Sequence, residues 1–327
     1  MTERSRRILF GIVRLAIAGA VLWFLATTGR VNWSSLRGLR DHWALTLLAL
    51  VLLFIAVVLI SQRVCMLFRP RGLRLSLRDS LGLSLIANLF TLVLPGGGGD
   101  IVRLFFTAKD AAGRRTEIGT LLLLDRVMGL LALTLFPVLA APLCLPLLRE
   151  SAALRALLAL AALSSAAIVF AIAVSTSRRA RALRGVQWVL RTFPLRGYPA
   201  RMLDTMQSFR TRLGVLAGAV AISLVAHAIC MGIVWMLVSM TQVGGRAADP
   251  AIPFLASIGF VANNVPITPG GLGVGEAAFE SLFGLAGLDG GAEAMLAWRL
   301  LLAGLAPLGL WYFVRGRAAA GVVPADA

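Results

Sequence analysis

Two glycine-rich strings stand out in this sequence because each of them interrupts an apolar segment. The first is Leu94-Pro95-Gly96-Gly97-Gly98-Gly99-Asp100, and the second is Thr268-Pro269-Gly270-Gly271-Leu272-Gly273. Backbone N–H and C=O groups find no water in hydrocarbon, so a helix breaks at membrane depth only where protein covers the break or a wet cavity meets it. Paired breaks are typical of the substrate site in a transporter built from an inverted repeat. The two strings therefore predict one shared substrate cavity.

Charged residues near the two strings could bind an anionic head group. A charge at the centre of a membrane helix costs roughly 2.5–3.5 kcal/mol on insertion scales, so each one needs a physical reason. Glycine-rich turns leave N–H groups free, and the helix N-termini that follow them attract phosphate, with arginine side chains as counter-charges. The charged residues concerned are Asp100, Arg103, Asp125, Arg126, Glu276, Glu280 and Arg299.

A structural role is the alternative for the same charges, which could neutralise one another to hold helices together. Glu276 and Glu280 are four residues apart and so share one helix face, and residues at i and i+3 can pair. The pairs that we expect in that case are Asp100–Arg103, Asp125–Arg126 and Glu276–Arg299.

Amide and hydroxyl groups accompany the charges. Asn88, Asn263, Asn264 and Thr268 could bind a head group or could satisfy the broken backbone, and the sequence favours neither role. The complete set of candidate substrate-binding residues is Asn88, Pro95, Gly96, Gly97, Gly99, Asp100, Arg103, Asp125, Arg126, Asn263, Asn264, Thr268, Pro269, Gly270, Gly271, Gly273, Glu276, Glu280 and Arg299.

Signatures of catalysis and of metal binding are missing from the sequence. His227 stands alone in an apolar segment, without HExxH spacing, and is expected to pack in the core. The cysteines, Cys65, Cys144 and Cys230, are far apart and lack CxxC spacing. No Walker A motif and no Ser/His/Asp order occurs. We therefore expect no enzyme activity, no metal site and no cofactor.

Long apolar runs predict the architecture. The chain has 327 residues, of which 59% are hydrophobic, and several runs reach the ~20 residues that a helix needs to cross a bilayer. We expect an all-α, polytopic membrane protein with a single domain, 1–327, divided into halves 1–141 and 152–327. Full spans are expected at 8–28, 44–62, 118–141, 152–175, 213–240 and 295–314. The arms of 79–106 and 251–287 are too short to span, so we expect two re-entrant hairpins there.

Arginine-rich loops orient these spans. The formal net charge of +17 would suggest nucleic acid for a soluble protein, but here the arginines cluster in short loops, so no nucleic-acid partner is expected. Basic loops, including the linker 178–212, recur on the side of the N-terminus. This places both termini in the cytoplasm of a bacterial cytoplasmic membrane. The hairpins then open from opposite sides, as an inverted repeat requires, although two unrelated glycine-rich loops would also give so short a match.

The chain resembles, over essentially its whole length, the flippase-like transmembrane family related to the membrane region of lysylphosphatidylglycerol synthases. The motifs that carry the resemblance are Leu94 through Arg103 (LPGGGGDIVR), Leu124 through Gly129 (LDRVMG), Pro266 through Glu276 (PITPGGLGVGE) and Trp298-Arg299. One departure is Gly98, where a bulkier apolar residue such as the Leu272 of the second string is expected.

The resemblance implies a protein that moves or binds lipids, including aminoacylated phosphatidylglycerol, or that assists glycolipid and hopanoid pathways. We expect a lipid translocase or lipid-binding transporter that acts on the phosphate-bearing head group of a phospholipid or glycolipid. The alternative is a non-transporting accessory subunit that presents lipid to a separate glycosyl- or aminoacyltransferase. The two-part synthases carry a soluble transferase domain after the membrane region, whereas this sequence stops at Ala327, so we do not expect it to synthesise lysyl lipid alone.

Overall fold

Helices make up most of the structure. A computed structural model describes residues 37–93, 98–109, 113–177, 179, 182, 184–185, 187–188, 198–241, 249–264, 271–315 and 323–324. Within these residues the sheet is a two-residue antiparallel ladder between β1 (Leu73–Arg74) and β2 (Val323–Pro324). The predicted all-α class is therefore confirmed. The expected span 8–28 and most of residues 178–197 of the expected linker 178–212 lie outside the described residues.

Five stretches of helix in the described part of the chain are long and apolar enough to cross a membrane. They are α3 (Trp43–Phe68, extended by η2, Arg69–Arg71), α6 (Arg115–Ala140, extended by η3, Ala141–Cys144, and α7, Leu145–Glu150), α8 (Ala152–Thr176), α11 (Leu213–Thr241), and α14 (Gly291–Gly304) with α15 (Ala306–Val314). A helix that is apolar all round is buried in protein or lipid. The prediction of a polytopic membrane protein is confirmed, with helices at five of the six expected positions.

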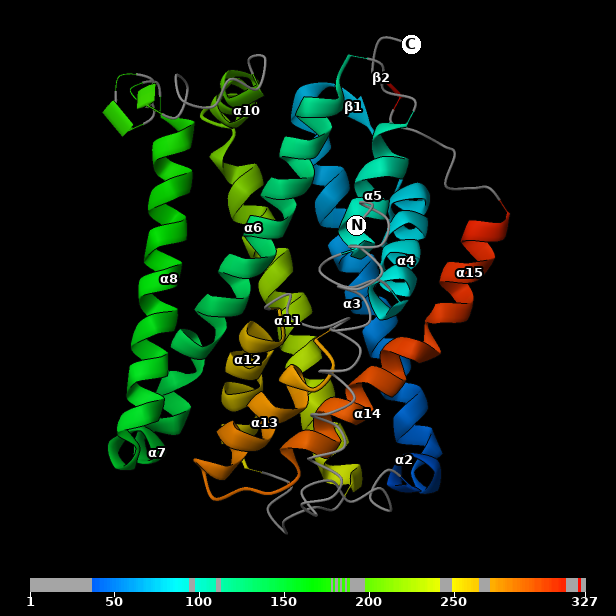
Figure 1. Cartoon of the computed structure of the whole chain (residues 1–327), viewed down its shortest axis with the longest axis vertical. Helices are drawn as coiled ribbons and strands as arrows, with labels where there is room; N and C mark the ends of the chain where they lie inside the picture. The colour runs from blue at the N-terminus through cyan, green and yellow to red at the C-terminus, as the bar shows by residue number, and fades with distance from the viewer. Residues whose placement is uncertain are drawn as a thin grey trace, which may run out of the picture.

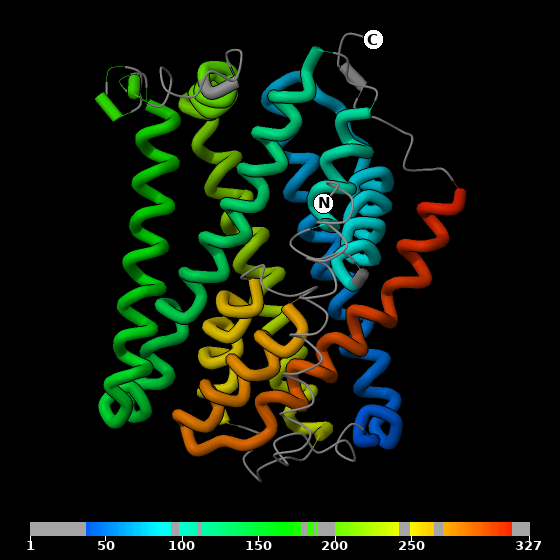
Figure 2. The backbone as a smooth tube through the Cα atoms, viewed as in Figure 1, coloured from blue at the N-terminus to red at the C-terminus, as the bar shows by residue number. Residues whose placement is uncertain are grey.

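Two pairs of shorter helices surround the glycine-rich strings. The first pair is α4 (Leu77–Val93) and α5 (Gly98–Ala108), and the second is α12 (Ala251–Asn263) and α13 (Val274–Gly284). At 1.5 Å per residue, α5, α12 and α13 are roughly 17–20 Å long, which is less than the ~30 Å of a bilayer core. The pairs lie in opposite halves of the molecule, upper and lower in Figure 1, and their interrupted ends face its middle (Figure 2).

The last long helix is divided at Leu305. Pro307 lies in the first turn of α15, and its ring leaves no room for the carbonyl group four residues earlier, so α14 ends at Gly304. The two parts have different neighbours, since α14 packs on α13 and α11 whereas α15 packs on α4. The α15–α4 contact is close, because a Cβ atom at Gly309 would lie 2.5 Å from the carbonyl oxygen of Leu85.

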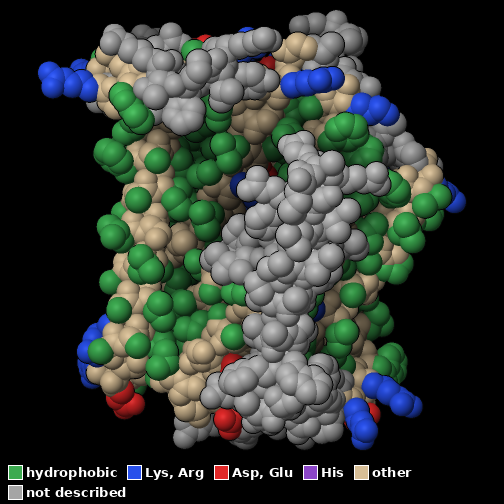
Figure 3. All heavy atoms as spheres, in the orientation of Figure 1, with side chains coloured by type: hydrophobic (Ala, Val, Ile, Leu, Met, Phe, Trp, Pro, Cys, Tyr) green, Lys and Arg blue, Asp and Glu red, His purple; other side chains and the backbone are tan. Residues whose placement is uncertain are grey.

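The outer surface is apolar in its middle. Among the coloured side chains of Figure 3, hydrophobic ones predominate between the two ends, and most of the visible arginine and lysine side chains lie toward those ends. On α8, large side chains such as Leu163 and Phe170 are about 70% exposed. Such an exposed apolar helix surface is suited to contact with lipid. Two short helices, α2 (Gly38–Asp41) and α10 (Tyr198–Gln207), lie at opposite ends of the molecule (Figure 1).

Candidate functional site

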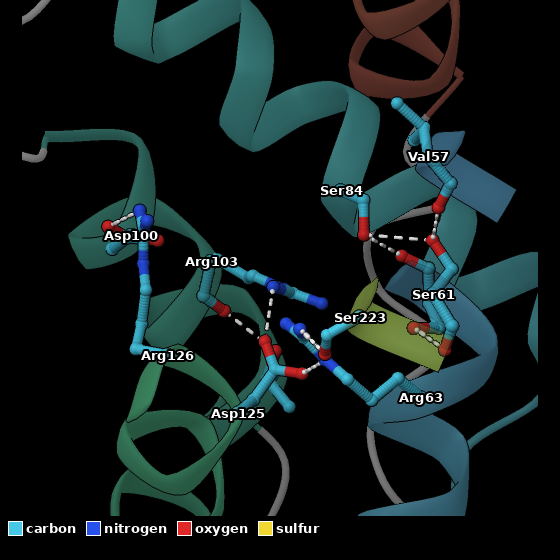
Figure 4. Close-up of polar contacts among 11 residues, drawn as sticks. Val57, Ser61, Arg63, Ser84, Asp100, Arg103, Asp125, Arg126 and Ser223 are labelled. Carbon is cyan, nitrogen blue, oxygen red and sulfur yellow. Dashed lines mark hydrogen bonds and ion pairs between the residues drawn. The ribbon is translucent and has the colours of Figure 1, made fainter. Parts of the chain in front are cut away.

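Asp125 is the centre of a buried charged cluster between four helices, α3, α5, α6 and α11. Its Oδ1 accepts a hydrogen bond from Arg63 Nε over 2.7 Å, and its Oδ2 accepts one from Arg103 Nη1 over 3.4 Å. Arg63 also donates from Nη1 to the Ser223 hydroxyl over 2.6 Å. Arg63, Asp125 and Ser223 are 4%, 2% and 0% exposed. We call Arg63, Arg103, Asp125 and Ser223 the first cluster (Figure 4).

Long helices carry these side chains deep into the bundle. Arg63 lies five residues before the end of α3, and Asp125 lies ten residues after the start of α6. At 1.5 Å per residue they are roughly 8 and 15 Å from that end of the molecule, so the cluster lies between the membrane interface and the midplane. Gly129, one turn beyond Asp125, leaves room for Arg63, because a Cβ atom there would lie 3.3 Å from Arg63 Nη1.

The first cluster contains more positive than negative charge. Two guanidinium groups, from Arg63 and Arg103, share the single carboxylate of Asp125. The side chain of Arg103 is 11% exposed, and its Nη2 is buried with no hydrogen-bond partner among the described residues. A buried, unpaired donor of a charged group is costly, so this nitrogen is the point of the cluster where a ligand would gain most.

A second ion pair lies next to the first cluster and is more exposed. Arg126 Nη2 contacts Asp100 Oδ2, and these side chains are 55% and 37% exposed. This corrects the expected pairing of Asp100 with Arg103 and of Asp125 with Arg126. Consecutive residues on a helix point about 100° apart, so Asp125 and Arg126 diverge, and each meets a different residue of the neighbouring α5 (Figure 4).

Glu276 is the centre of another buried cluster, at the second helix break. It is 0% exposed. Its Oε1 accepts from Arg299 Nε over 2.5 Å, and its Oε2 accepts from the Gly273 backbone N–H over 2.7 Å. Arg299 Nη2 donates to Asn263 Oδ1 over 3.0 Å and to the Gly271 carbonyl over 2.7 Å. We call these five residues the second cluster, and the expected Glu276–Arg299 pair is confirmed.

Glycine is required where the second cluster approaches the backbone. Gly271 and Gly273 have φ angles of +74° and +81°, in the left-handed region that side chains disfavour. A Cβ atom at Gly271 would also lie 2.3 Å from Asn263 Oδ1. Glu276 is the third residue of α13 and bonds back to the cap residue Gly273, so one carboxylate caps the helix and neutralises Arg299.

The remaining predicted residues have structural contacts or lie outside the described chain. Asn88 donates to the Leu302 carbonyl over 3.4 Å, Asn264 donates to the Phe260 carbonyl over 2.8 Å, and Glu280 accepts from the Ala292 N–H over 3.2 Å. A Cβ atom at Gly99 would lie 2.2 Å from the Ala87 carbonyl oxygen, so this glycine allows close packing of α5 on α4. Predicted residues outside the described chain are Pro95, Gly96, Gly97, Thr268, Pro269 and Gly270.

Sequence reasoning missed Arg63 and Ser223. The predicted span 44–62 ends one residue before Arg63, whereas α3 continues to Phe68. The five apolar residues that follow Arg63, Val64 through Phe68, were the available signal that the helix continues past it, whereas a lone serine in an apolar helix gives no comparable signal. His227 Nδ1 lies 2.8 Å from the Ser223 carbonyl oxygen, and the described residues contain no group of His, Cys, Asp and Glu suited to a metal ion.

Comparison with known proteins gives one match. Residues 11–309 match a family model described as the lysylphosphatidylglycerol synthase TM region. No curated protein and no solved structure matches the chain.

Proposed function

Because the chain belongs to the family of the lysylphosphatidylglycerol synthase TM region, a membrane family linked to lipid handling, we propose that it translocates or carries a lipid with a polar, phosphate-bearing head group. The proposal is for a transport protein rather than an enzyme. Acyl chains would stay in the bilayer while the head group crosses along charged residues inside the protein.

The observation that carries the proposal is the correspondence between the two broken-helix pairs. α4 and α12 begin at residues 77 and 251, α5 and α13 at 98 and 274, and α6 and α14 at 115 and 291. The spacing is 174 to 176 residues in every case. In both halves an ion pair joins the second short helix to the long helix that follows, Arg103 to Asp125 and Glu276 to Arg299.

This correspondence, with the pairs entering from opposite ends of the molecule (Figure 1), supports an inverted repeat with two re-entrant hairpins. In transporters of that design the substrate site lies near the bilayer midplane, where broken helices of the two repeats meet. Rocking of one repeat against the other would expose the site to each side of the membrane in turn.

Loop charges support an orientation. The end of the molecule where α3 meets α4, and α5 meets α6, carries Arg69, Arg71, Arg74, Arg114 and Arg115. The opposite end carries Arg37, Arg40 and Arg149 among its described residues, together with acidic residues that include Asp41, Glu150, Asp249 and Asp289. By the positive-inside bias, the arginine-rich end faces the cytoplasm. The α4–α5 pair would then enter from the cytoplasmic side of a bacterial cytoplasmic membrane, and α12–α13 from the outer side.

The test is head-group translocation by the pure protein in liposomes. Fluorescent phospholipids with different head groups are reconstituted with it, and the fraction that external dithionite bleaches is measured. We expect head-group-dependent bleaching beyond the outer-leaflet half for the natural sequence, and bleaching of only that half for the Arg126→Ala and Glu276→Ala variants. Arg78→Ala, which removes an exposed arginine outside both clusters, is the matched control and keeps full activity.

Two outcomes would refute the proposal. If no lipid moves, although the protein is correctly inserted, translocation is wrong, and a non-transporting subunit that presents lipid to a separate transferase becomes the better account. If both variants move lipid as fast as the natural sequence, the assignment of the path to the Asp100–Arg126 pair and the second cluster is wrong.

A further inference from the structure

The two buried clusters differ in their balance of charge. In the second cluster one carboxylate, Glu276, faces one guanidinium, Arg299, whose Nε and Nη2 both have partners. In the first cluster one carboxylate faces two guanidiniums, and Arg103 Nη2 has no partner among the described residues. The adjoining Asp100–Arg126 pair is itself neutral. The first cluster therefore carries one excess positive charge inside the bundle, and the second carries none.

We propose that the first cluster binds the monoanionic phosphodiester of a membrane lipid, with Arg103 Nη2 donating to a phosphate oxygen. The assignment rests on the proposed function and deepens it, because it names the cluster and the class of ligand. A phosphodiester has one negative charge, which balances the excess charge of the cluster, whereas a phosphomonoester carries about −1.5 to −2 near pH 7. The planar fork of arginine also suits phosphate geometry.

The surroundings of Arg103 favour a lipid as the source of that phosphate. Arg103 faces α6, whereas Ile101, Leu104 and Phe105 on the same helix are 67%, 39% and 64% exposed. Thus α5 carries a phosphate-binding group on one side and an exposed apolar stripe on another. A phospholipid whose head group reaches Arg103 could keep its acyl chains along that stripe, whereas a free phosphate ion would gain nothing from it.

Hydrogen bonds within the first cluster also hold Arg103 in place before a ligand binds. Arg63 bonds both Asp125 and Ser223, and Asp125 in turn holds Arg103 Nη1. Arg103 is thereby fixed at Nη1, while its Nη2 is buried without a hydrogen-bond partner among the described residues. Fixing a donor before the ligand arrives lowers the entropy lost on binding.

The experiment measures lipid binding by the purified full chain in detergent micelles. Unfolding temperature is followed while phosphatidylglycerol is added, since a ligand that binds only the folded protein raises that temperature. Diacylglycerol with the same acyl chains is the phosphate-free control. We expect phosphatidylglycerol to stabilise the protein and diacylglycerol not to do so. Arg103→Gln should weaken the apparent affinity about tenfold or more, the effect of one lost charge-assisted hydrogen bond.

Control variants make the result specific. Arg78→Gln removes one exposed positive charge from α4 outside the cluster and should bind as the natural sequence does. Arg103→Lys keeps the charge but loses the fork, so it should bind less tightly than the natural sequence and more tightly than Arg103→Gln. If Arg103→Gln does not fold, Arg103→Lys decides the matter, and unchanged affinity in that variant overturns the proposal.

Other outcomes overturn the assignment or decide whether the bound phosphate belongs to a lipid or is a free ion. Equal binding by folded Arg103→Gln and the natural sequence, or equal stabilisation by diacylglycerol, overturns the assignment. Inorganic phosphate that displaces phosphatidylglycerol at comparable concentration would show that the ligand is free phosphate and not a lipid. Failure of the proposed function is separable, because the natural sequence would then bind phosphatidylglycerol in micelles yet move no lipid in liposomes.

Discussion

Replacing Glu276 by Gln tests whether the buried Glu276–Arg299 ion pair of the second cluster stabilises the folded protein. The variant keeps the shape of the side chain and one acceptor oxygen, so the Gly273 N–H can still be satisfied. It removes the negative charge of the carboxylate, whose Oε1 and Oε2 accept hydrogen bonds from Arg299 Nε over 2.5 Å and from Arg299 Nη2 over 3.3 Å. Glu276 is fully buried and Arg299 is 12% exposed, so the guanidinium would stay inside the bundle without its partner.

The expected loss is large. Removing one member of a buried ion pair costs about 3–5 kcal/mol, because the other charge is left uncompensated. At roughly 2 °C per kcal/mol for a chain of this size, the unfolding temperature should fall by roughly 6–10 °C. The assay is thermal unfolding of the purified protein in detergent, with intrinsic tryptophan fluorescence as the signal.

A double variant separates charge from packing. Glu276→Gln combined with Arg299→Gln removes both charges, so it should recover at least about 1 kcal/mol of the loss in Glu276→Gln alone. Glu280→Gln, one turn further along α13, is the matched control and should cost about 1 kcal/mol. The reasoning is refuted if Glu276→Gln costs no more than Glu280→Gln, or if the double variant is less stable than Glu276→Gln.

Two further variants test the packing of the first half. Gly99→Ala should lower the free energy of unfolding by about 1–3 kcal/mol, the usual cost of overpacking, because the new Cβ would meet the Ala87 carbonyl oxygen at 2.2 Å; a loss below about 0.5 kcal/mol in denaturant titration would contradict this. Ser223→Ala should cost about 1.5–3 kcal/mol because it removes the hydrogen bond to the charged Arg63. Ser239→Ala, an exposed site on the same α11, should stay within about 0.5 kcal/mol, and equal losses at the two serines would contradict a role for the charged bond.

Properties that depend on nearby sequence were predictable. The lengths of the apolar runs predicted five helices that the structure contains. The proline and glycine residues predicted the interruptions between α4 and α5 and between α12 and α13. The Glu276–Arg299 pair was also predictable, because one acidic residue follows the second break and one arginine lies inside the last expected span. These features need only local periodicity and the cost of a buried charge.

Pairings that depend on how helices face one another were not predictable. Asp125 could have met several arginines, and only the packing of α3 and α5 against α6 selects Arg63 and Arg103. Arg63 lies outside the predicted span 44–62 because a membrane helix was expected to have ~20 residues, whereas α3 has 26. A hydrophobic run fixes where a helix must exist but not how far it continues beyond the hydrocarbon.

The division of the last long helix at Leu305 makes the two halves of the protein mechanically dependent on each other. α14 carries Arg299 of the second cluster, whereas α15 is packed against α4 with its Gly309 backbone on Leu85. A displacement of α4 would therefore pull on α15, and the joint at Leu305 would either bend or transmit the movement to Arg299. Stiffness at this joint is thus one determinant, beside the packing of α11 on α3 and of α12 on α6, of how strongly a change at one end of the molecule is felt at the other.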